Sequence, residues 1–268
     1  MTLSIVCITF YMLAAAILLK HSKKNTDDTN SASKNTVLLP GVAAVLLHGF
    51  ILFSYSLYTP HGLDLSVFTV LSLVSWITAT FLIITAFRQP VECLAIIVFP
   101  FAAVTLLLRI TSEQHHYITQ ISNGLETHIL LSIISYSILS IAAVQSILLY
   151  MQDYHLHNKQ PGGFITALPS LETMEILLFK MIGLGFILLT VSLASGIPYL
   201  EDIQQQHLTH KIILSCIAWF VFAVLLWGRW NFGWRGQTAI RWTMGGFVLL
   251  MLAYFGSNIV LQVILQRP

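Results

Sequence analysis

The chain has 268 residues, of which 56% are hydrophobic and only 9% are charged, and its formal net charge at pH 7 is +2. A soluble domain needs more charged residues to cover its exterior, so the composition excludes a soluble globular protein. The small net charge, with no basic tract longer than Lys20–Lys24, gives no reason to expect a nucleic-acid partner. The mean hydropathy of +0.80 agrees with a protein whose solvent is the lipid bilayer.

Eight apolar segments are each long enough to cross a bilayer, which takes about 20 residues in a helix. In chain order they are 3–19, 37–57, 66–87, 91–109, 127–151, 175–199, 211–228 and 239–265. No internal repeat and no attached soluble domain interrupts them. We therefore expect an all-α, polytopic fold of eight transmembrane helices that forms a single integral membrane domain over residues 1–268.

The first apolar segment could in principle be a cleaved signal peptide. It has no basic stretch before Leu3 and no small-residue cleavage site after Leu19. We therefore expect it to be retained as a helix.

The basic residues between the spans predict the orientation of the chain. Ten of them lie in or beside the odd-numbered loops and three on the opposite side. The ten are Lys20, Lys23, Lys24, Lys34, Arg88, Lys159, Lys180, Arg229, Arg235 and Arg241, and the three are Arg109, Lys211 and Arg267. The positive-inside rule then places the odd-numbered loops in the cytoplasm and both termini outside.

The two longest loops, Lys20–Asn35 and Gln152–Met174, differ in character. The first is polar and without periodicity. The second contains a turn at Pro161-Gly162-Gly163 and then Ser170, which is a good N-cap and is closely followed by acidic residues. We expect a short connecting helix that leads into the sixth span.

The three cysteines, Cys7, Cys93 and Cys216, lie in or at the edge of three separate spans. They form neither a Cys-x-x-Cys pair nor a zinc-binding spacing. We expect them to serve packing, and we expect no thiol–disulfide exchange by this protein.

Histidines gather on the side of the membrane that this topology makes extracytoplasmic. Six of the ten lie in or beside the outer loops: His61, His115, His116, His128, His207 and His210. His128 begins the fifth span and His210 begins the seventh, and both spans run from outside to inside, so the two side chains should lie at similar depth. Two such imidazoles can hold a planar haem from opposite faces. The alternative is that each is a polar anchor at a helix end.

Two other histidine patterns leave alternatives open. His48 lies within the second span, where an ionisable group suggests a function such as haem passage, although one hydrogen bond to a neighbouring helix would also satisfy it. His207 and His210 are three residues apart, a spacing that allows a zinc site if Glu201 or Asp202 contributes. The aromatic run 227–236 looks like a haem platform, but the topology makes it a cytoplasmic belt and anchor.

Three motifs in the second half of the chain carry a family resemblance. They are His128-Ile-Leu-Leu-Ser-Ile-Ile-Ser-Tyr136, Gly233-Trp-Arg-Gly236 and Ala253-Tyr-Phe-Gly-Ser257. A weaker echo precedes them in Pro60-His61-Gly-Leu-Asp-Leu-Ser66 and Leu73-Val-Ser-Trp76. With these motifs, strongest over residues 61–268, the chain resembles the cytochrome c assembly family of membrane haem-handling proteins. It is most similar to the short branch of uncharacterised bacterial inner-membrane proteins in that family.

The resemblance implies a location in the bacterial inner (cytoplasmic) membrane and a role for His128 as an external axial ligand of haem b. It also implies partners: haem, and other cytochrome assembly or haem-biosynthesis membrane proteins. Two family features are absent from the sequence. The tryptophan-rich external signature is missing between Ser195 and Ser215, and no histidine follows Tyr254. His210 would then substitute as the second ligand, with His61 and His48 as further candidates for contact with haem.

Three hypotheses for function follow. The first is a haem-handling protein of cytochrome c assembly or haem trafficking, which binds haem b without covalent catalysis and is not an enzyme. The second is a non-haem scaffold or regulatory protein on the same fold that stabilises a partner membrane enzyme. The third, a transporter, is least favoured because the sequence has no repeat and no pair of broken helices around a midplane site.

Overall fold

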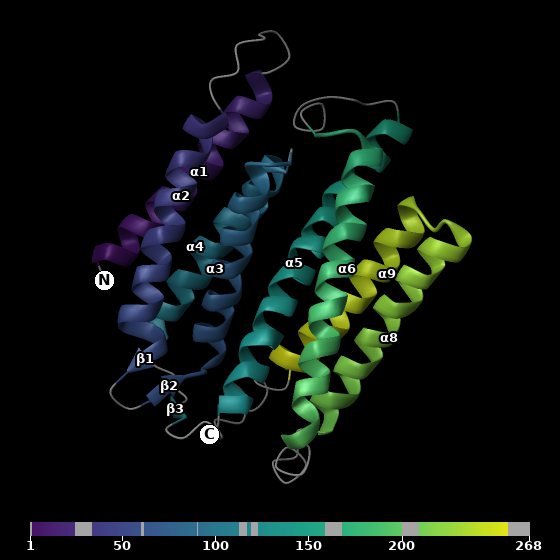
Figure 1. Cartoon of the computed structure of the whole chain (residues 1–268). Helices are drawn as coiled ribbons and strands as arrows, with labels where there is room; N and C mark the ends of the chain where they lie inside the picture. Colours follow the sequence, from purple (N-terminus) through teal and green to yellow (C-terminus); the bar gives the residue numbers. More distant parts are fainter. Residues whose placement is uncertain are drawn as a thin grey trace. The chain divides into compact units, whose positions relative to one another are not determined.

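The computed structural model describes residues 2–24, 34–59, 62–89, 91–112, 117–118, 123–158, 168–199 and 209–256. Eight α-helices account for most of these residues (Figure 1). They are α1 (Thr2–Lys24), α2 (Lys34–Ile51), α3 (Val67–Ala86), α4 (Ala95–Thr111), α5 (Asn123–His157), α6 (Leu171–Gly196), α8 (Thr209–Phe232) and α9 (Gly236–Met251).

Seven of these helices are long and apolar enough to cross a membrane. The remaining one, α9, has 16 residues and continues into the π-helical turn η5 (Leu252–Gly256). Other short turns extend α2 (η1, Leu52–Leu57), α4 (η2, Glu92–Leu94) and α6 (η4, Ile197–Tyr199). The predicted all-α membrane fold is confirmed, and the described helices match the eight predicted spans in number and order.

The chain divides into two compact units. The first comprises Met1–Thr119 and Met151–Thr173, and the second comprises Gln120–Tyr150 and Met174–Pro268. The single membrane domain expected from the sequence stays a prediction.

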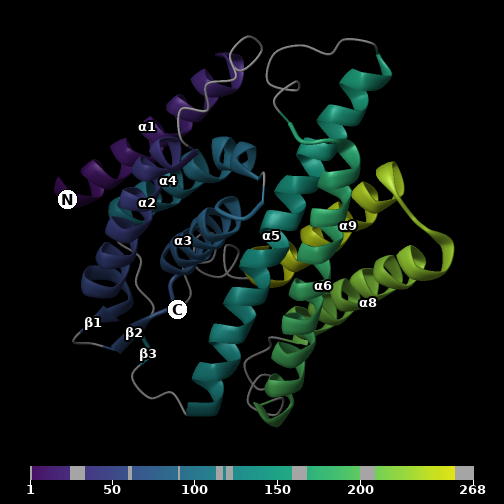
Figure 2. The same cartoon turned by 45° about the horizontal axis from the view of Figure 1, so that its top comes forward.

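In the first unit, four helices form a closed ring. Helix α1 packs on α2 and α4, and α3 packs on the same two helices (Figures 1 and 2). Close approach is possible because small residues lie at the contacts. A Cβ atom added to Gly41 of α2 would lie 2.7 Å from the ring of Phe99 on α4, which itself packs on Tyr11 of α1.

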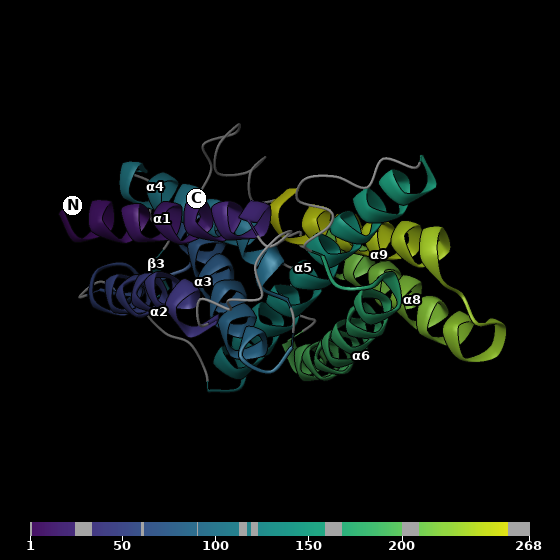
Figure 3. The ribbon, with the colours of Figure 1, turned by 90° about the horizontal axis from the view of Figure 1, so that it is seen from above.

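The second unit repeats this arrangement with α5, α6, α8 and α9. Helix α8 packs on α9, and Trp219 of α8 stacks on Phe186 of α6, with ring centroids 5.4 Å apart. The aromatic rings of Tyr136 on α5 and Phe247 on α9 have centroids 5.6 Å apart, and this contact closes the ring of four helices. Seen from above, α8 lies beside α6 and α9 (Figure 3). The start of α5, the end of α6 and the start of α8 lie at one end of this unit (Figure 1).

A small antiparallel sheet lies at one end of the first unit and was not expected from the sequence. Strand β1 (Tyr58–Thr59) pairs with β2 (Gly62–Asp64), which pairs with β3 (Tyr117–Ile118). The sheet joins the chain between α2 and α3 to the chain after α4. Strands this short carry no hydrophobic alternation, so the sequence gives no signal for them.

The connection between the fifth and sixth spans differs from the prediction. Helix α5 continues to His157 and α6 begins at Leu171, so both helices extend beyond the apolar spans. Ser170 is the expected cap, since its Oγ accepts the backbone N–H of Thr173 at 3.3 Å. The helix expected after Ser170 is therefore present, but it is the first turn of α6 and not a separate connecting helix.

The glycines of α6 make a matched pair for a test of packing. A Cβ atom at Gly185 would lie 2.6 Å from Leu139 on α5, whereas at Gly183 it would meet nothing within 4 Å. Helix α6 therefore approaches α5 closely at Gly185 but has open space at Gly183. We predict that Gly185→Leu lowers the thermal stability in detergent, because overpacking costs about 1–3 kcal/mol.

The matched variant Gly183→Leu should leave the melting temperature unchanged or raise it, because a helix interior favours leucine over glycine by about 1 kcal/mol. Equal melting curves for the two variants would show that α5 and α6 do not meet at Gly185.

The orientation of the chain in the membrane stays a prediction, and reporter fusions test it. Fusions at Asn35 and Gln160 should report the cytoplasm, and fusions at Asn123 and Gln205 should report the extracytoplasmic side. The physical reason is the ten-to-three division of the basic residues. A cytoplasmic signal at Asn123 would reverse the orientation and place His128 on the inner side.

Candidate functional site

His128 lies in the second turn of α5 and is partly buried against the last turns of α6. Its Nδ1 atom lies 2.9 Å from the backbone oxygen of Ser192 and 3.1 Å from Oγ of Ser195. These contacts join residues more than 60 positions apart in the chain. The imidazole is thus held by the neighbouring helix and does not extend freely from a helix end, as a simple polar anchor would.

The contact with a carbonyl oxygen determines which ring nitrogen carries the proton. A carbonyl can only accept a hydrogen bond, so Nδ1 of His128 must donate and must be protonated. In the neutral ring the lone pair is then on Nε2, the nitrogen available to a metal ion. Among the described residues, Nε2 makes no hydrogen bond that would compete.

Aromatic side chains of the second unit pack further along α5, where this helix contacts α9 and η5. Tyr136 lies two turns further along α5, and its hydroxyl contacts the sulfur atom of Met251. Its ring packs against Tyr254 in η5, with centroids 6.3 Å apart. The Nζ atom of Lys211, in the first turn of α8, lies 6.0 Å from the Tyr254 ring centre. The Tyr254 ring is therefore bordered by the Tyr136 ring and by the ammonium group of Lys211.

Two of the predicted site residues have side chains outside the described part of the structure. His210 belongs to the first turn of α8, at the same end of the second unit as His128, but only its backbone is described. His61 lies between the paired residues Thr59 and Gly62 and is outside the described residues. The pairing of His128 with either residue stays a prediction.

His48 belongs to the first unit and is fully buried there. Its Nδ1 lies 3.1 Å from the hydroxyl of Tyr11, and its Nε2 lies 2.9 Å from Oγ of Ser72. Both ring nitrogens are engaged by neighbouring helices, so ligation of iron would require His48 to give up at least one hydrogen bond. This geometry favours the hydrogen-bonded interior histidine over a role in haem passage.

The zinc alternative falls on residues that the structure does not describe, namely His207, Glu201 and Asp202. Within the described ranges, no three histidine, cysteine or acidic side chains lie close enough together to hold a metal ion. The cysteines of the described residues are free thiols. Cys7 is buried, and its Sγ lies 3.3 Å from the backbone oxygen of Ala44.

The aromatic run 227–236 comprises the end of α8 and the turn that leads into α9. Gly233 and Gly236 both have a positive φ there, of 64° and 51°, which glycine adopts without strain. Trp234 folds back over Gly228 and stacks on Trp242, with centroids 5.5 Å apart. This packing gives Trp234 a structural role, and the position of the run as a cytoplasmic belt and anchor stays a prediction.

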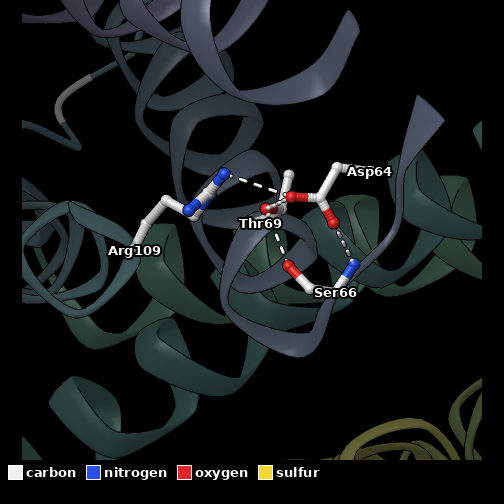
Figure 4. A network of polar contacts seen from close by, with 4 residues as sticks. All are labelled: Asp64, Ser66, Thr69 and Arg109. Atoms are coloured by element: carbon white, nitrogen blue, oxygen red, sulfur yellow. Dashed lines mark hydrogen bonds and ion pairs between the residues drawn. The ribbon is translucent and has the colours of Figure 1, made fainter. Parts of the chain in front are cut away.

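The first unit contains a buried ion pair that the sequence reasoning missed. Arg109 Nη2 donates to Asp64 Oδ2 at 3.1 Å, and the Asp64 side chain is completely buried (Figure 4). The same carboxylate accepts the N–H of Ser66 at 2.9 Å and the hydroxyl of Thr69 at 3.2 Å. Asp64 thereby joins the sheet, the start of α3 and the end of α4.

The family model described as "Cytochrome C assembly protein" matches residues 36–265. The chain is 37% identical over 238 residues to the inner membrane protein YpjD of Escherichia coli (strain K12), and this match covers 88% of the chain and 90% of the relative. A cytochrome c biogenesis protein CcsA of Chlamydomonas reinhardtii is 30% identical over 143 residues, 52% of the chain and 39% of that protein.

An uncharacterised 28.8 kDa protein of Azospirillum brasilense is 32% identical over 143 residues, 53% of each chain. The family match spans both compact units and most of the described helices. The chain therefore belongs to the cytochrome c assembly protein family, as a multi-pass inner-membrane protein of its short bacterial branch.

Proposed function

We propose that this protein acts in cytochrome c biogenesis as a haem-handling membrane protein. It binds haem b at the extracytoplasmic end of the second unit and passes or holds it without covalent catalysis. The observation that carries the proposal is the geometry of His128, whose Nδ1 proton is donated to a carbonyl and whose Nε2 lone pair is available to iron. The family membership and the relatives named for cytochrome c biogenesis support it.

The residues of the chain fit a haem in three respects. His128 supplies one imidazole nitrogen, and His210, at the same end of the unit, supplies the second. The aromatic pair Tyr136 and Tyr254 belongs to the same unit and would supply apolar surface for a macrocycle. Haem, when bound, contributes an iron atom that two imidazoles can ligate from opposite faces.

Optical spectroscopy of purified protein tests the proposal directly. Protein reconstituted with haem in mild detergent should show the spectrum of a low-spin, bis-histidine haem, with sharp reduced α and Soret bands. Two neutral imidazoles give a low-spin ferric iron, so electron paramagnetic resonance provides a second check. If wild-type protein shows no histidine-dependent Soret shift at all, haem binding is excluded.

The second candidate is a scaffold that stabilises a partner membrane enzyme and binds no haem. The observation in its favour is the missing tryptophan-rich signature between Ser195 and Ser215. Partners in this case would be other cytochrome assembly or haem-biosynthesis membrane proteins. Loss of the partner's abundance on deletion of this protein, together with a haem-free spectrum, would support the scaffold over the haem-handling function.

A further inference from the structure

Three serines surround His128, and we propose that they position its ring and fix its tautomer for iron. These are Ser132 of α5 and Ser192 and Ser195 of α6, called the serine cluster below. The inference rests on the proposed function, in which His128 is an axial ligand, and it adds the residues that prepare this ligand. All four residues belong to the second compact unit.

The proton of each serine in the cluster can be assigned from its neighbours. Ser132 Oγ donates to the backbone oxygen of His128 at 2.7 Å, so its only proton is used. Ser192 Oγ, 2.6 Å from Ser132 Oγ, must then be the donor in that contact. Ser195 Oγ donates to the backbone oxygen of Ser192 at 2.7 Å. Each of the three hydroxyl protons is thereby assigned to one acceptor, and the three hydrogen-bond directions are mutually compatible.

The imidazole completes this network as a donor. The Ser195 hydroxyl donates its only proton to the backbone carbonyl of Ser192. Its Oγ can therefore only accept a hydrogen bond from Nδ1 of His128. Nδ1 therefore faces two acceptors, the Ser192 oxygen and Ser195 Oγ, at 2.9 and 3.1 Å. In the other tautomer, Nδ1 would carry a lone pair that faces these two oxygen acceptors, and this arrangement is repulsive. The cluster thus selects the tautomer with its lone pair on Nε2.

Steric contact limits the ring as well. A Cβ atom added to Gly196 would lie 2.8 Å from Cε1 of His128 and 3.2 Å from its Nδ1. The ring therefore lies directly against the backbone of α6, where only glycine leaves enough room. The Ser132–Ser192 bond holds the two helices together one turn away, so the carbonyl that accepts the Nδ1 proton stays in place.

These contacts have a consequence for any iron bound at Nε2. An imidazole that donates its other N–H to an acceptor is a stronger ligand, and such outer partners typically change metal affinity by about 10–100-fold. The serine cluster is therefore a set of positioning residues: it does not touch the iron, but it sets the orientation and the basicity of the residue that does.

The first experiment needs no haem. Protein labelled with ¹⁵N-histidine should show His128 as the Nδ1–H tautomer, with its signal assigned by its loss in His128→Gln. In Ser195→Ala, the signal should broaden or shift because one acceptor is gone, while Ser195→Thr should restore it. A His128 signal with the proton on Nε2 in wild-type protein would overturn the inference, whatever the protein does with haem.

The second experiment uses the haem-loaded protein and reads affinity, electron paramagnetic resonance and midpoint potential. Ser195→Ala should weaken haem binding by roughly 10-fold, broaden the low-spin signal and raise the potential, because the imidazole becomes a weaker donor. Ser195→Thr should behave like wild type. Gly196→Ala should displace the ring and convert part of the iron to high spin.

A control variant and a double-mutant cycle complete these experiments. Ser146→Ala removes a buried hydroxyl of α5 that bonds, among the described residues, the backbone oxygen of Ala143, and it should change none of these readouts. Ser132→Ala and Ser192→Ala should be non-additive, because each removes the same bond. If Ser195→Ala matches wild type while His128→Ala loses the low-spin spectrum, the serine cluster has no positioning role. If His128→Ala keeps the low-spin spectrum and the haem affinity of wild type, the proposed function itself fails.

Discussion

Replacement of His128 by alanine should remove the low-spin spectrum of the haem-loaded protein and leave a five-coordinate or water-ligated, high-spin iron. The reason is that Nε2 of His128 is the ring nitrogen left with a lone pair by the contacts of Nδ1 with Ser192 and Ser195. Haem affinity should fall by more than the roughly 10–100-fold that loss of an outer-shell partner costs a metal site. Absorption titrations with haem measure both effects.

His210→Ala should give the same change in spin state, and the double variant should abolish binding. His155→Ala and His157→Ala are the matched controls, because both residues lie in the last turn of α5, at the opposite end of the helix from His128. If His210→Ala keeps a low-spin spectrum while His128→Ala loses it, the second ligand is His207, His61 or a residue of a haem-receiving partner. An unaltered spectrum in His128→Ala would contradict the assignment of the first ligand.

The helices of this protein could be predicted because each is determined by local composition. An apolar run of about 20 residues has few alternatives to a membrane-spanning helix. The ends were less predictable, since polar residues can continue a helix into water. Helix α5 extends to His157 through a polar segment that looks like a loop, and only the cap at Ser170 gave a local signal for the start of α6.

The environment of each histidine could be predicted only in part. The position of His128 at the start of a span follows from the sequence, but its acceptors on α6 are more than 60 residues away and have no local signature. His48 was open to two interpretations for the same reason. Its partners, Tyr11 and Ser72, are ordinary residues of other helices, and only their three-dimensional arrangement shows that both ring nitrogens are engaged.

Charge spacing was equally uninformative for the ion pair of the first unit. Arg109 was counted as one of three basic residues on the outer side, and Asp64 was part of a weak family echo. They are 45 residues apart in sequence, and the sheet that brings them together has strands of two or three residues. A pairing that depends on such a short sheet cannot be found from hydrophobic pattern or propensity.

Loss of the Asp64 carboxylate should strongly destabilise the first unit, because this side chain is completely buried and holds a buried cation. Asp64→Ala leaves the buried guanidinium of Arg109 without its ion-pair partner, and breaking a buried pair in this way costs about 3–5 kcal/mol. Nε of Arg109 has no hydrogen-bond partner among the described residues, so the Asp64 contact is the main compensation for burial of this charge. Asp64→Ala also removes the acceptor for the Ser66 N–H at the start of α3.

Thermal unfolding in mild detergent measures this effect, and the melting temperature should fall by roughly 10 °C. The variant Asp64→Asn should be intermediate, because an amide oxygen can still accept the Ser66 N–H but cannot balance the charge of Arg109. Thr111→Val, which removes an exposed hydroxyl that bonds only backbone oxygens of its own helix, is the control and should melt like wild type.

The double variant Asp64→Asn with Arg109→Met separates the charge from the rest of the contact. Once the guanidinium is gone, no buried charge remains without a partner, so the double variant should be more stable than Asp64→Asn alone. The haem spectrum should be unchanged in both, because His128 and the serine cluster belong to the second unit. If Asp64→Ala melts like wild type, then solvent or lipid headgroups already compensate Arg109 and the pair does not hold the sheet to α4. If the double variant is less stable than the single one, the two side chains contribute independently and the ion pair is not the source of the stability.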